Sequence, residues 1–177
     1  ESKIKLGTKI YGPTSIGPKC RIGGEIKNSI FQGYSNKSHD GYLGNSVIGE
    51  WVNLGANTNC SNLKNTFSKA KVWSYDEGKM IDSGEKFLGC CIGDFSKTGI
   101  STMLNTASVV GVNANVFGSG FQKKIIRSFA WGEGETYALE KAWEENKNIA
   151  QMNGEELSDA DYLILQNIHS SNLDFDL

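Results

Sequence analysis

An aliphatic residue recurs at every sixth position over several stretches of this chain. Near the amino end the repeat is led by four isoleucines: Ile4, Ile10, Ile16 and Ile22. It returns at Ile48 and Leu54, and it is clearest in a run with five successive lead residues: Ile92, Thr98, Leu104, Val110 and Val116. The fifth position of each hexad in that run is small: Ser96, Thr102, Ser108, Ala114 and Gly120. A period of six is neither that of a helix nor that of an alternating strand.

Hexads of this kind are typical of a chain that winds into stacked coils, in which every sixth side chain points inward and a small residue shares the crowded interior. Each coil contacts only its neighbours, so the core of such a solenoid is thin. The modest hydrophobic content of 38% agrees with a thin core. We therefore predict an all-β fold, a single-stranded parallel β-helix built from hexapeptide repeats.

The repeat loses its phase twice. The first slip falls between Tyr34 and Ile48, and the second between Leu54 and Ile92. The second gap is too long for a tight corner, so we predict an excursion from the β-helix at about residues 62–88. Long excursions from compact repeats often carry function or form interfaces.

From about Gly134 the spacing of apolar residues becomes helical. The pattern predicts one helix that ends at Asn153–Gly154, where Gly is a good C-cap. A second helix is expected after Ser158, whose spacing to Asp161 resembles a capping box. We therefore expect a β-helix over residues 1–132 and an acidic helical C-terminal extension over residues 133–177, in which His169 has a surface or packing role.

Charge and composition narrow the function classes. The net charge of −2 gives no nucleic-acid signature, although residues 1–132 carry a net +7 that could attract phosphorylated ligands. No apolar run or signal peptide indicates a membrane protein.

The four cysteines, which form no CxxC pair, indicate reduced thiols in a cytoplasmic protein, and two histidines do not suffice for a three-histidine metal centre. We expect no metal site. The chain begins at Glu1 rather than Met, which suggests a fragment of a longer protein.

Two segments with the hexads carry a resemblance to a known family: KSHDGYLGNSVIGEWVNLGANTNCSN at residues 37–62 and LGCCIGDFSKTGIS at residues 88–101. Over roughly residues 4–131 the chain resembles the C-terminal half of bifunctional sugar-1-phosphate nucleotidyltransferases/acetyltransferases. The resemblance implies a left-handed β-helix that works as an acetyltransferase domain. The family's N-terminal nucleotidyltransferase domain, with its glycine-rich nucleotide loop, is absent from this chain and is expected upstream of Glu1.

The resemblance implies a role for five residues around the substrate. His39 matches the general base that acts on the sugar amine, and a neutral imidazole near pH 7 suits that task. Tyr42 matches a substrate-contacting tyrosine, and Asn53 and Asn62 match asparagines that hold the sugar and the acetyl group. Lys27 resembles a lysine that neutralises the sugar phosphate. Taken by itself, a histidine in a polar, glycine-rich turn is equally typical of a protein surface.

The resemblance also implies acetyl-CoA as cofactor, lying along the coils around Ala56 and the turn at residues 98–102. The residues expected to bind it are Ala56, Ile100, Gly118, Lys123, Lys124 and Arg127. The last three could meet the phosphates by charge. As basic residues at the end of a solenoid, they are equally typical of a solvated surface.

These observations predict an acyl-CoA-dependent N-acetyltransferase that acts on an amino-sugar 1-phosphate in UDP- or dTDP-sugar synthesis. Its active site is expected at the seam between β-helices of a homotrimer, and its partner is a sugar phosphate or nucleotide sugar. The alternative is a non-catalytic β-helix that trimerises or regulates an upstream nucleotidyltransferase domain. A γ-class carbonic anhydrase is disfavoured by the shortage of histidines, and an ice-binding protein by the lack of a regular Thr-x-Thr array.

Overall fold

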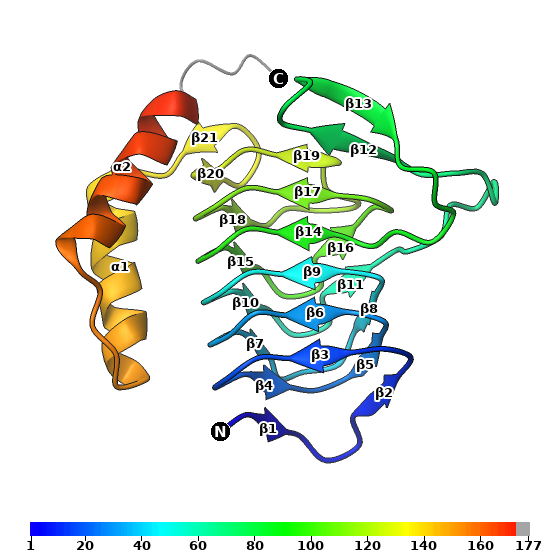
Figure 1. The fold of residues 1–177 in the computed structure, drawn as a ribbon, viewed down its shortest axis with the longest axis horizontal. Helices are drawn as coiled ribbons and strands as arrows, with labels where there is room; N and C mark the ends of the chain where they lie inside the picture. Colours follow the sequence, from blue (N-terminus) through cyan, green and yellow to red (C-terminus); the bar gives the residue numbers. More distant parts are fainter. Residues whose placement is uncertain (173–177) are drawn as a thin grey trace.

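The aliphatic residues that lead the hexads point into the interior of a left-handed parallel β-helix, so the predicted fold is confirmed. The computed structural model describes residues 1–172, and residues 173–177 of the predicted extension lie outside the described residues. In Figure 1 the coils rise from the amino end to the carboxyl end as stacked three-sided rungs. All neighbouring strands within the coils are parallel, which follows from a chain that always winds in one direction.

Three sheets form the sides of the β-helix, here called sheets A, B and C. Sheet A contains β1 (Lys3–Ile4), β4 (Arg21–Ile22), β7 (Asn36–Lys37), β10 (Asn53–Leu54), β15 (Lys97–Thr98), β18 (Asn115–Val116), β20 (Ala130–Trp131) and the antiparallel β21 (Glu135–Thr136). Sheet B contains β2 (Lys9–Tyr11), β5 (Glu25–Lys27), β8 (Tyr42–Gly44), β11 (Asn59–Cys60) and β16 (Met103–Leu104). Sheet C contains β3 (Ser15–Ile16), β6 (Ile30–Phe31), β9 (Val47–Ile48), β14 (Cys91–Ile92), β17 (Val109–Val110) and β19 (Ile125–Ile126).

The interior follows the hexad pattern where coils lie on both sides. The five lead residues from Ile92 to Val116 are all buried, and so are four of the five small residues, Gly120 near the last coil being exposed. In the first coil Ile4 and Ile10 are exposed, because no described residue stacks beneath them. Burial of the lead side chains is the main source of stability in a solenoid, so the end coils are its weakest parts.

Each corner of the β-helix turns through a residue with positive φ. We call the corners A–B, B–C and C–A after the sheets that they join. At the A–B corner these residues are mostly glycine: Gly7, Gly24, Gly41, Asn57, Ser101 and Gly118. At the C–A corner they are larger, with φ between 52° and 60°: Lys19, Tyr34, Trp51, Phe95, Asn113 and Phe129. Large residues adopt this conformation rarely, so something must hold them there.

Two helices cover the C–A corner: α1 (Leu139–Met152) and α2 (Asp159–Asn172). Ala150 of α1 packs against Trp51 and Phe95, and Leu139 and Ala142 pack against Phe129. Figure 1 shows both helices standing along one side of the coils. This burial against apolar side chains stabilises both the helices and the strained corner residues.

The helix ends agree with the sequence in part. The first helix begins at Leu139 rather than near Gly134, because Glu135–Thr136 pairs with β20 as an antiparallel strand. Its end at Asn153 is as predicted, and the predicted capping box is present, since the Ser158 and Asp161 side chains each accept a hydrogen bond from the other's backbone N–H. Neither helix is long and apolar enough to cross a membrane, within the part of the chain that the structure describes.

Between β11 and β14 the chain leaves the coils and forms an antiparallel hairpin of β12 (Lys71–Ser74) and β13 (Lys79–Asp82). The hairpin lies away from the helices and near the carboxyl end of the coils (Figure 1). The Lys124 ammonium donates a hydrogen bond to the carbonyl of Lys71 and so ties the hairpin to the last coil. The division of the chain into a β-helical part over residues 1–132 and an extension over residues 133–177 stays a prediction.

Candidate active site

His39 lies in a loop at the A–B corner, residues 38–41, which joins β7 to β8. The side chains of His39 and its neighbour Asp40 are exposed to solvent. The His39 imidazole makes no hydrogen bond or ion pair with any described residue. A ring placed in this way is accessible to a molecule that binds beside the loop.

The backbone of this loop is held from both sides, in contrast to the free imidazole. The coil beneath donates the Glu25 N–H to the carbonyl of Gly41 at 3.2 Å, and the coil above donates the Asn57 N–H to the carbonyl of Asp40 at 2.9 Å. Gly41 has φ of +121°, and a Cβ there would meet the Thr58 carbonyl oxygen at 2.1 Å. The loop therefore presents an exposed histidine from a backbone with little freedom.

Next to the loop, the outer face of sheet B gathers most of the predicted substrate residues. Tyr42 is paired in register with Glu25, and Lys27 with Gly44. Because Gly44 has no side chain, the Tyr42 hydroxyl and the Asn62 amide lie over it and would contact any Cβ placed there. Asn62 Nδ2 also donates to Asn45 Oδ1 at 2.8 Å. The structure thus brings Lys27, Tyr42 and Asn62 together.

Charge and burial on this face set the ionisation of two tyrosines. Burial and the Glu25 carboxylate raise the pKa of Tyr42, while its hydrogen bond with Asn62 opposes the rise. Tyr11 donates a hydrogen bond to Glu25, which raises the pKa of Tyr11 to about 12. Both phenols are therefore neutral hydrogen-bond donors near pH 7, and the Lys27 ammonium lies 5.7 Å from the centroid of the Tyr11 ring.

A groove of about 320 Å³ runs beside the His39 loop. Its lining comes from four successive coils at the A–B corner and on sheet B: Gly7, Lys9, Gly24, Glu25, Asp40, Gly41, Tyr42, Asn57 and Asn59. The lining is polar and carries charges of both signs, which suits a small, hydrophilic molecule better than an apolar one.

Asn53 lies elsewhere, on the outer face of sheet A. Its Oδ1 accepts a hydrogen bond from Asn36 Nδ2 at 2.6 Å, and Asn36 Oδ1 in turn accepts one from Ser38. Asn53 and Asn62 are therefore on different sides of the β-helix, although the resemblance implies that both contact the substrate. Within one chain the structure does not bring these two asparagines together.

Three of the predicted cofactor residues lie at the A–B corner on successive coils above His39. Ala56 belongs to the next turn, where its carbonyl accepts the Ser101 N–H at 2.8 Å. Ile100 is 79% exposed on the turn above, and Gly118 follows on the turn after that. We call Ala56, Ile100 and Gly118 the corner ridge. It rises directly from the His39 loop.

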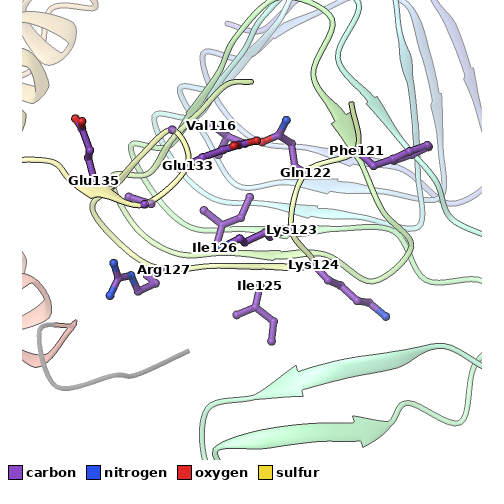
Figure 2. Close-up of a pocket in the computed structure, with 13 residues that line it drawn as sticks. Val116, Phe121, Gln122, Lys123, Lys124, Ile125, Ile126, Arg127, Glu133 and Glu135 are labelled. Atoms are coloured by element: carbon purple, nitrogen blue, oxygen red, sulfur yellow. The ribbon is translucent and has the colours of Figure 1, made fainter. Parts of the chain in front are cut away.

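The three predicted basic residues line a cavity of about 600 Å³ at the carboxyl end of the coils. Figure 2 shows Lys123, Lys124 and Arg127 on one side of it and Glu133 and Glu135 on the other. Lys124 is turned toward the hairpin, and burial and the charge of Lys64 lower its pKa. The ridge reaches this cavity, because Gly118 lies close to Glu133 and Gln122, which both line it.

The remaining polar candidates have structural environments. Cys20, Cys60 and Cys90 are buried free thiols. Burial raises the pKa of Cys20, and a hydrogen bond with Cys60 together with burial raises the pKa of Cys90. His169, a residue of α2, packs edge-on against Phe129, with ring centroids 4.8 Å apart. Among residues 1–172, no cluster of three or more His, Cys, Asp or Glu could hold a metal ion.

Sequence reasoning missed one residue beside His39. Lys37 is a charged residue at a position where the hexad pattern calls for an inward aliphatic side chain, and it is 1% exposed. The signal was available, because Lys37 falls within the first slip of the repeat. It was hidden because the slip itself obscures which residues of that coil face inward.

Comparisons with known proteins agree with the resemblance. No protein-family model matches the chain. A bifunctional sugar-1-phosphate nucleotidylyltransferase/acetyltransferase of Sulfurisphaera tokodaii is 33% identical over 153 aligned positions, covering 75% of this chain and 37% of the relative. A bifunctional protein GlmU of Synechococcus (strain CC9311) is 28% identical over 141 positions, covering 78% and 27%. Another bifunctional protein GlmU, from Methanococcus vannielii, is 39% identical over 111 positions, covering 63% and 25%.

The chain spans less than two fifths of the length of these relatives. The fold and the comparisons agree, since the chain forms a β-helix of hexapeptide repeats and is similar to these relatives over about three quarters of its length. This chain is a β-helical relative of the bifunctional sugar-1-phosphate nucleotidylyltransferases/acetyltransferases, similar to one part of them.

Proposed function

We propose that this chain is an acetyl-CoA-dependent N-acetyltransferase domain that acts on an amino-sugar 1-phosphate, with His39 as general base. The observation that carries the proposal is the position of His39. Its loop is held by both neighbouring coils, its imidazole is free, and it lies between the polar face of sheet B and the corner ridge. A rigid backbone that presents a free imidazole is what proton transfer to a reacting group requires.

In the proposed reaction the sugar amine attacks the thioester carbonyl of acetyl-CoA. A C–N bond forms, the C–S bond breaks, and the coenzyme A thiolate leaves. The His39 imidazole takes the proton that the attacking amine must lose and passes it to the thiolate. Tyr42 and Asn62 donate hydrogen bonds to the sugar, and Lys27 neutralises its phosphate, because an ammonium can meet phosphate oxygens as a point charge.

The corner ridge supplies a path for acetyl-CoA. Ala56 and Ile100 lie on the two turns above His39, and Gly118 leads to the cavity that contains Lys123, Lys124 and Arg127. We place the thioester near His39 and the phosphates near these three cations. Glu133 and Glu135 in the same cavity repel the phosphates. Binding therefore depends on the combined charge of the three cations rather than on any one of them.

A homotrimer completes the proposal. Asn53 belongs to sheet A, whereas Asn62 follows strand β11 of sheet B and contacts Asn45, so the two asparagines lie on different sides of one β-helix. A seam between two copies, with sheet A of one against sheet B of the next, would place both asparagines on one substrate. The proposed protein is cytoplasmic and takes part in nucleotide-sugar synthesis, and its four free cysteines fit the first of these.

The test combines coenzyme A titration with an acetyl-transfer assay on glucosamine 1-phosphate. In His39→Ala we expect kcat to fall by about 10²–10⁴-fold, the range of general base catalysis, while the Kd for coenzyme A is unchanged. His169→Gln is the matched control, because the other histidine lies on α2 against Phe129 at the C–A corner, and its replacement should leave kcat unchanged.

The rival proposal is a non-catalytic β-helix that trimerises or regulates an upstream nucleotidyltransferase domain. One observation favours it: within a single chain the predicted substrate residues are divided between two sheets. A wild-type protein that is trimeric by light scattering but binds no coenzyme A would establish the rival. Binding with transfer that depends on His39 would exclude it.

A further inference from the structure

Lys37 occupies a core position of the β-helix. It is paired in register with Ile22 of the coil beneath and lies in a column of inward residues that continues with Leu54, Thr98 and Val116. Its side chain is among the largest fully buried ones of the described residues. Lysine is almost never fully buried unless its charge has partners.

The partners of the Lys37 ammonium are backbone carbonyls of the A–B corner. Nζ donates to the carbonyl of Gly23 at 3.1 Å and to the carbonyl of His39 at 3.0 Å. No carboxylate among the described residues makes an ion pair with it. The ammonium therefore links the coil beneath to the backbone of the candidate catalytic histidine itself.

Gly24 leaves the space that this arrangement needs. A Cβ at Gly24 would meet Lys37 Nζ at 2.7 Å and the carbonyl oxygens of His39 and Gly41 at 2.8 Å each. Its φ of +73° is also one that other residues rarely adopt. The space left by Gly24 thus accommodates the Lys37 ammonium between two neighbouring coils, where it contacts the backbone of the His39 loop.

We propose that Lys37 is a positioning residue: its ammonium fixes the backbone of His39 from inside the β-helix, so that the imidazole is presented to substrate in one orientation. The inference rests on the proposed function. A leucine or isoleucine in this column would bury no charge, and apolar replacements of buried charges are often neutral or stabilising. The lysine costs stability and gains a donor for a carbonyl that no other described group satisfies.

The test is Lys37→Met, which keeps the length of the side chain and removes the donor. We expect kcat for acetyl transfer to fall by roughly 10–100-fold, because a small displacement of a catalytic group has effects of this size, while the KM for acetyl-CoA stays within about twofold. The melting temperature is unchanged or higher. If Lys37 had only a structural role, its replacement would lower stability together with kcat. A fall in kcat without a fall in melting temperature therefore supports a positioning role.

Amide hydrogen exchange gives a readout that does not depend on acetyl transfer. The N–H groups of Glu25 and Asn57 donate to carbonyls of the His39 loop, and both should exchange about tenfold faster in Lys37→Met. The Asn36 N–H, which belongs to the coil of Lys37 and donates to the Val52 carbonyl of the coil above, should be unchanged. Ser96→Ala is the matched control, since Ser96 also links two coils from the interior but lies at the C–A corner.

The outcomes separate the two proposals. Wild-type exchange rates at Glu25 and Asn57 in Lys37→Met would overturn the positioning role, whether or not the protein transfers acetyl groups. Faster exchange in a protein that transfers no acetyl group supports the positioning role and ends the proposed function. If Lys37→Met does not fold, Gly24→Ala replaces it, because its methyl group pushes on the same ammonium and carbonyl; unchanged kcat and exchange in that variant would equally overturn the proposal.

Discussion

The A–B and C–A corners solve the same backbone problem with opposite kinds of residue. Each coil must turn through a left-handed residue at both corners. At the A–B corner most of these residues are glycine, and the corner is open to solvent around His39 and Ile100. At the C–A corner they include Tyr34, Trp51 and Phe95, which stack on one another beneath helix α1.

The contrast between the two corners indicates that one serves stability and the other is the candidate for function. Trp51 is stacked on Tyr34 at 4.0 Å and on Phe95 at 6.0 Å between ring centroids, and the strain of its positive φ is offset by this packing. The A–B corner has mostly small residues and a groove lined by polar residues instead. The helices thus cover the corner that holds the fold together and leave uncovered the corner that we propose as the site.

Trp51→Ala should have one of the two largest effects on stability among the variants considered. Trp51 is 7% exposed, and its removal leaves a cavity between Tyr34, Phe95 and Ala150. We expect the free energy of unfolding to fall by about 3–5 kcal/mol. The replacement keeps a Cβ and therefore the backbone strain, so the loss reports on packing alone. Urea denaturation followed by circular dichroism measures it.

Ile100→Ala provides the contrast at the A–B corner. Ile100 is 79% exposed, so its truncation should change the free energy of unfolding by less than about 0.5 kcal/mol. If Ile100 contacts acetyl-CoA, the same variant weakens coenzyme A binding, whereas Trp51→Ala leaves the affinity of the folded protein unchanged. Similar stability losses in the two variants would contradict the division between the corners.

Gly41→Ala tests whether the A–B corner, though open, is tightly built. A Cβ at Gly41 would lie 2.1 Å from the Thr58 carbonyl oxygen, and φ is +121°. Strain and overpacking together should cost about 4 kcal/mol. Gly134→Ala is matched in backbone conformation, with φ of +110°, but has nothing within 4 Å, so it should cost about 1–2 kcal/mol.

Both costs are read from denaturation curves of the same protein. If Gly41→Ala and Gly134→Ala lowered the free energy of unfolding by the same amount, the His39 loop would be able to shift and accommodate a methyl group. The loop would then lack the rigidity on which the general-base proposal depends.

The fold was predictable because a solenoid repeats one local rule. Inward aliphatic and small residues recur with the period of the coil, so Ile92 and Ser96 could be assigned to the core from the sequence alone. The start of α1 was not predictable in this way. The helical spacing of apolar residues extends back to Gly134. Glu135–Thr136 nevertheless pairs with the edge of β20 as an antiparallel strand, and the spacing of apolar residues carries no information about that edge.

The candidate site was predictable only in part. The resemblance identified Tyr42, Asn62 and Lys27, and the register of sheet B brings them side by side. That Asn53 faces away from them depends on which corner the chain has turned, and the slip in the repeat conceals this. The burial of Lys37 is hidden for the same reason, because inward and outward positions can be told apart only once the coil length is known.

The pH dependence of stability gives a further contrast, because a buried lysine belongs to the A–B corner alone. Burial lowers the pKa of Lys37 to about 8 from its usual 10.5, and the charge of Asp40 only partly opposes this. Below pH 8 the lysine is protonated in both the folded and the unfolded chain, and folding must bury its charge. Between pH 8 and 10.5 the unfolded chain binds more protons, so raising the pH favours the folded state.

Relative to Lys37→Met, the wild-type protein should therefore gain stability on the order of 3 kcal/mol between pH 7 and pH 11. Only the difference between the two proteins is informative. Tyr11 and Cys90, whose pKa values are raised, destabilise both proteins at high pH in the same way. A difference that does not vary with pH, measured by urea titration at several pH values, would show that Lys37 does not carry a buried charge.

A small, local loss of stability is expected at the cap of helix α2, the outer layer over the C–A corner. The Ser158 hydroxyl accepts the Asp161 N–H, while the Asp161 carboxylate accepts the Ser158 N–H at 2.7 Å, so Ser158→Ala removes half of the box. The loss should be about 1 kcal/mol and local to α2, visible as faster amide exchange there. Coenzyme A affinity should not change, because the helices pack on the far corner. If loosening α2 weakened binding at the A–B corner, the two corners would be coupled through the coils, and the helices would be part of the site rather than a cover for its scaffold.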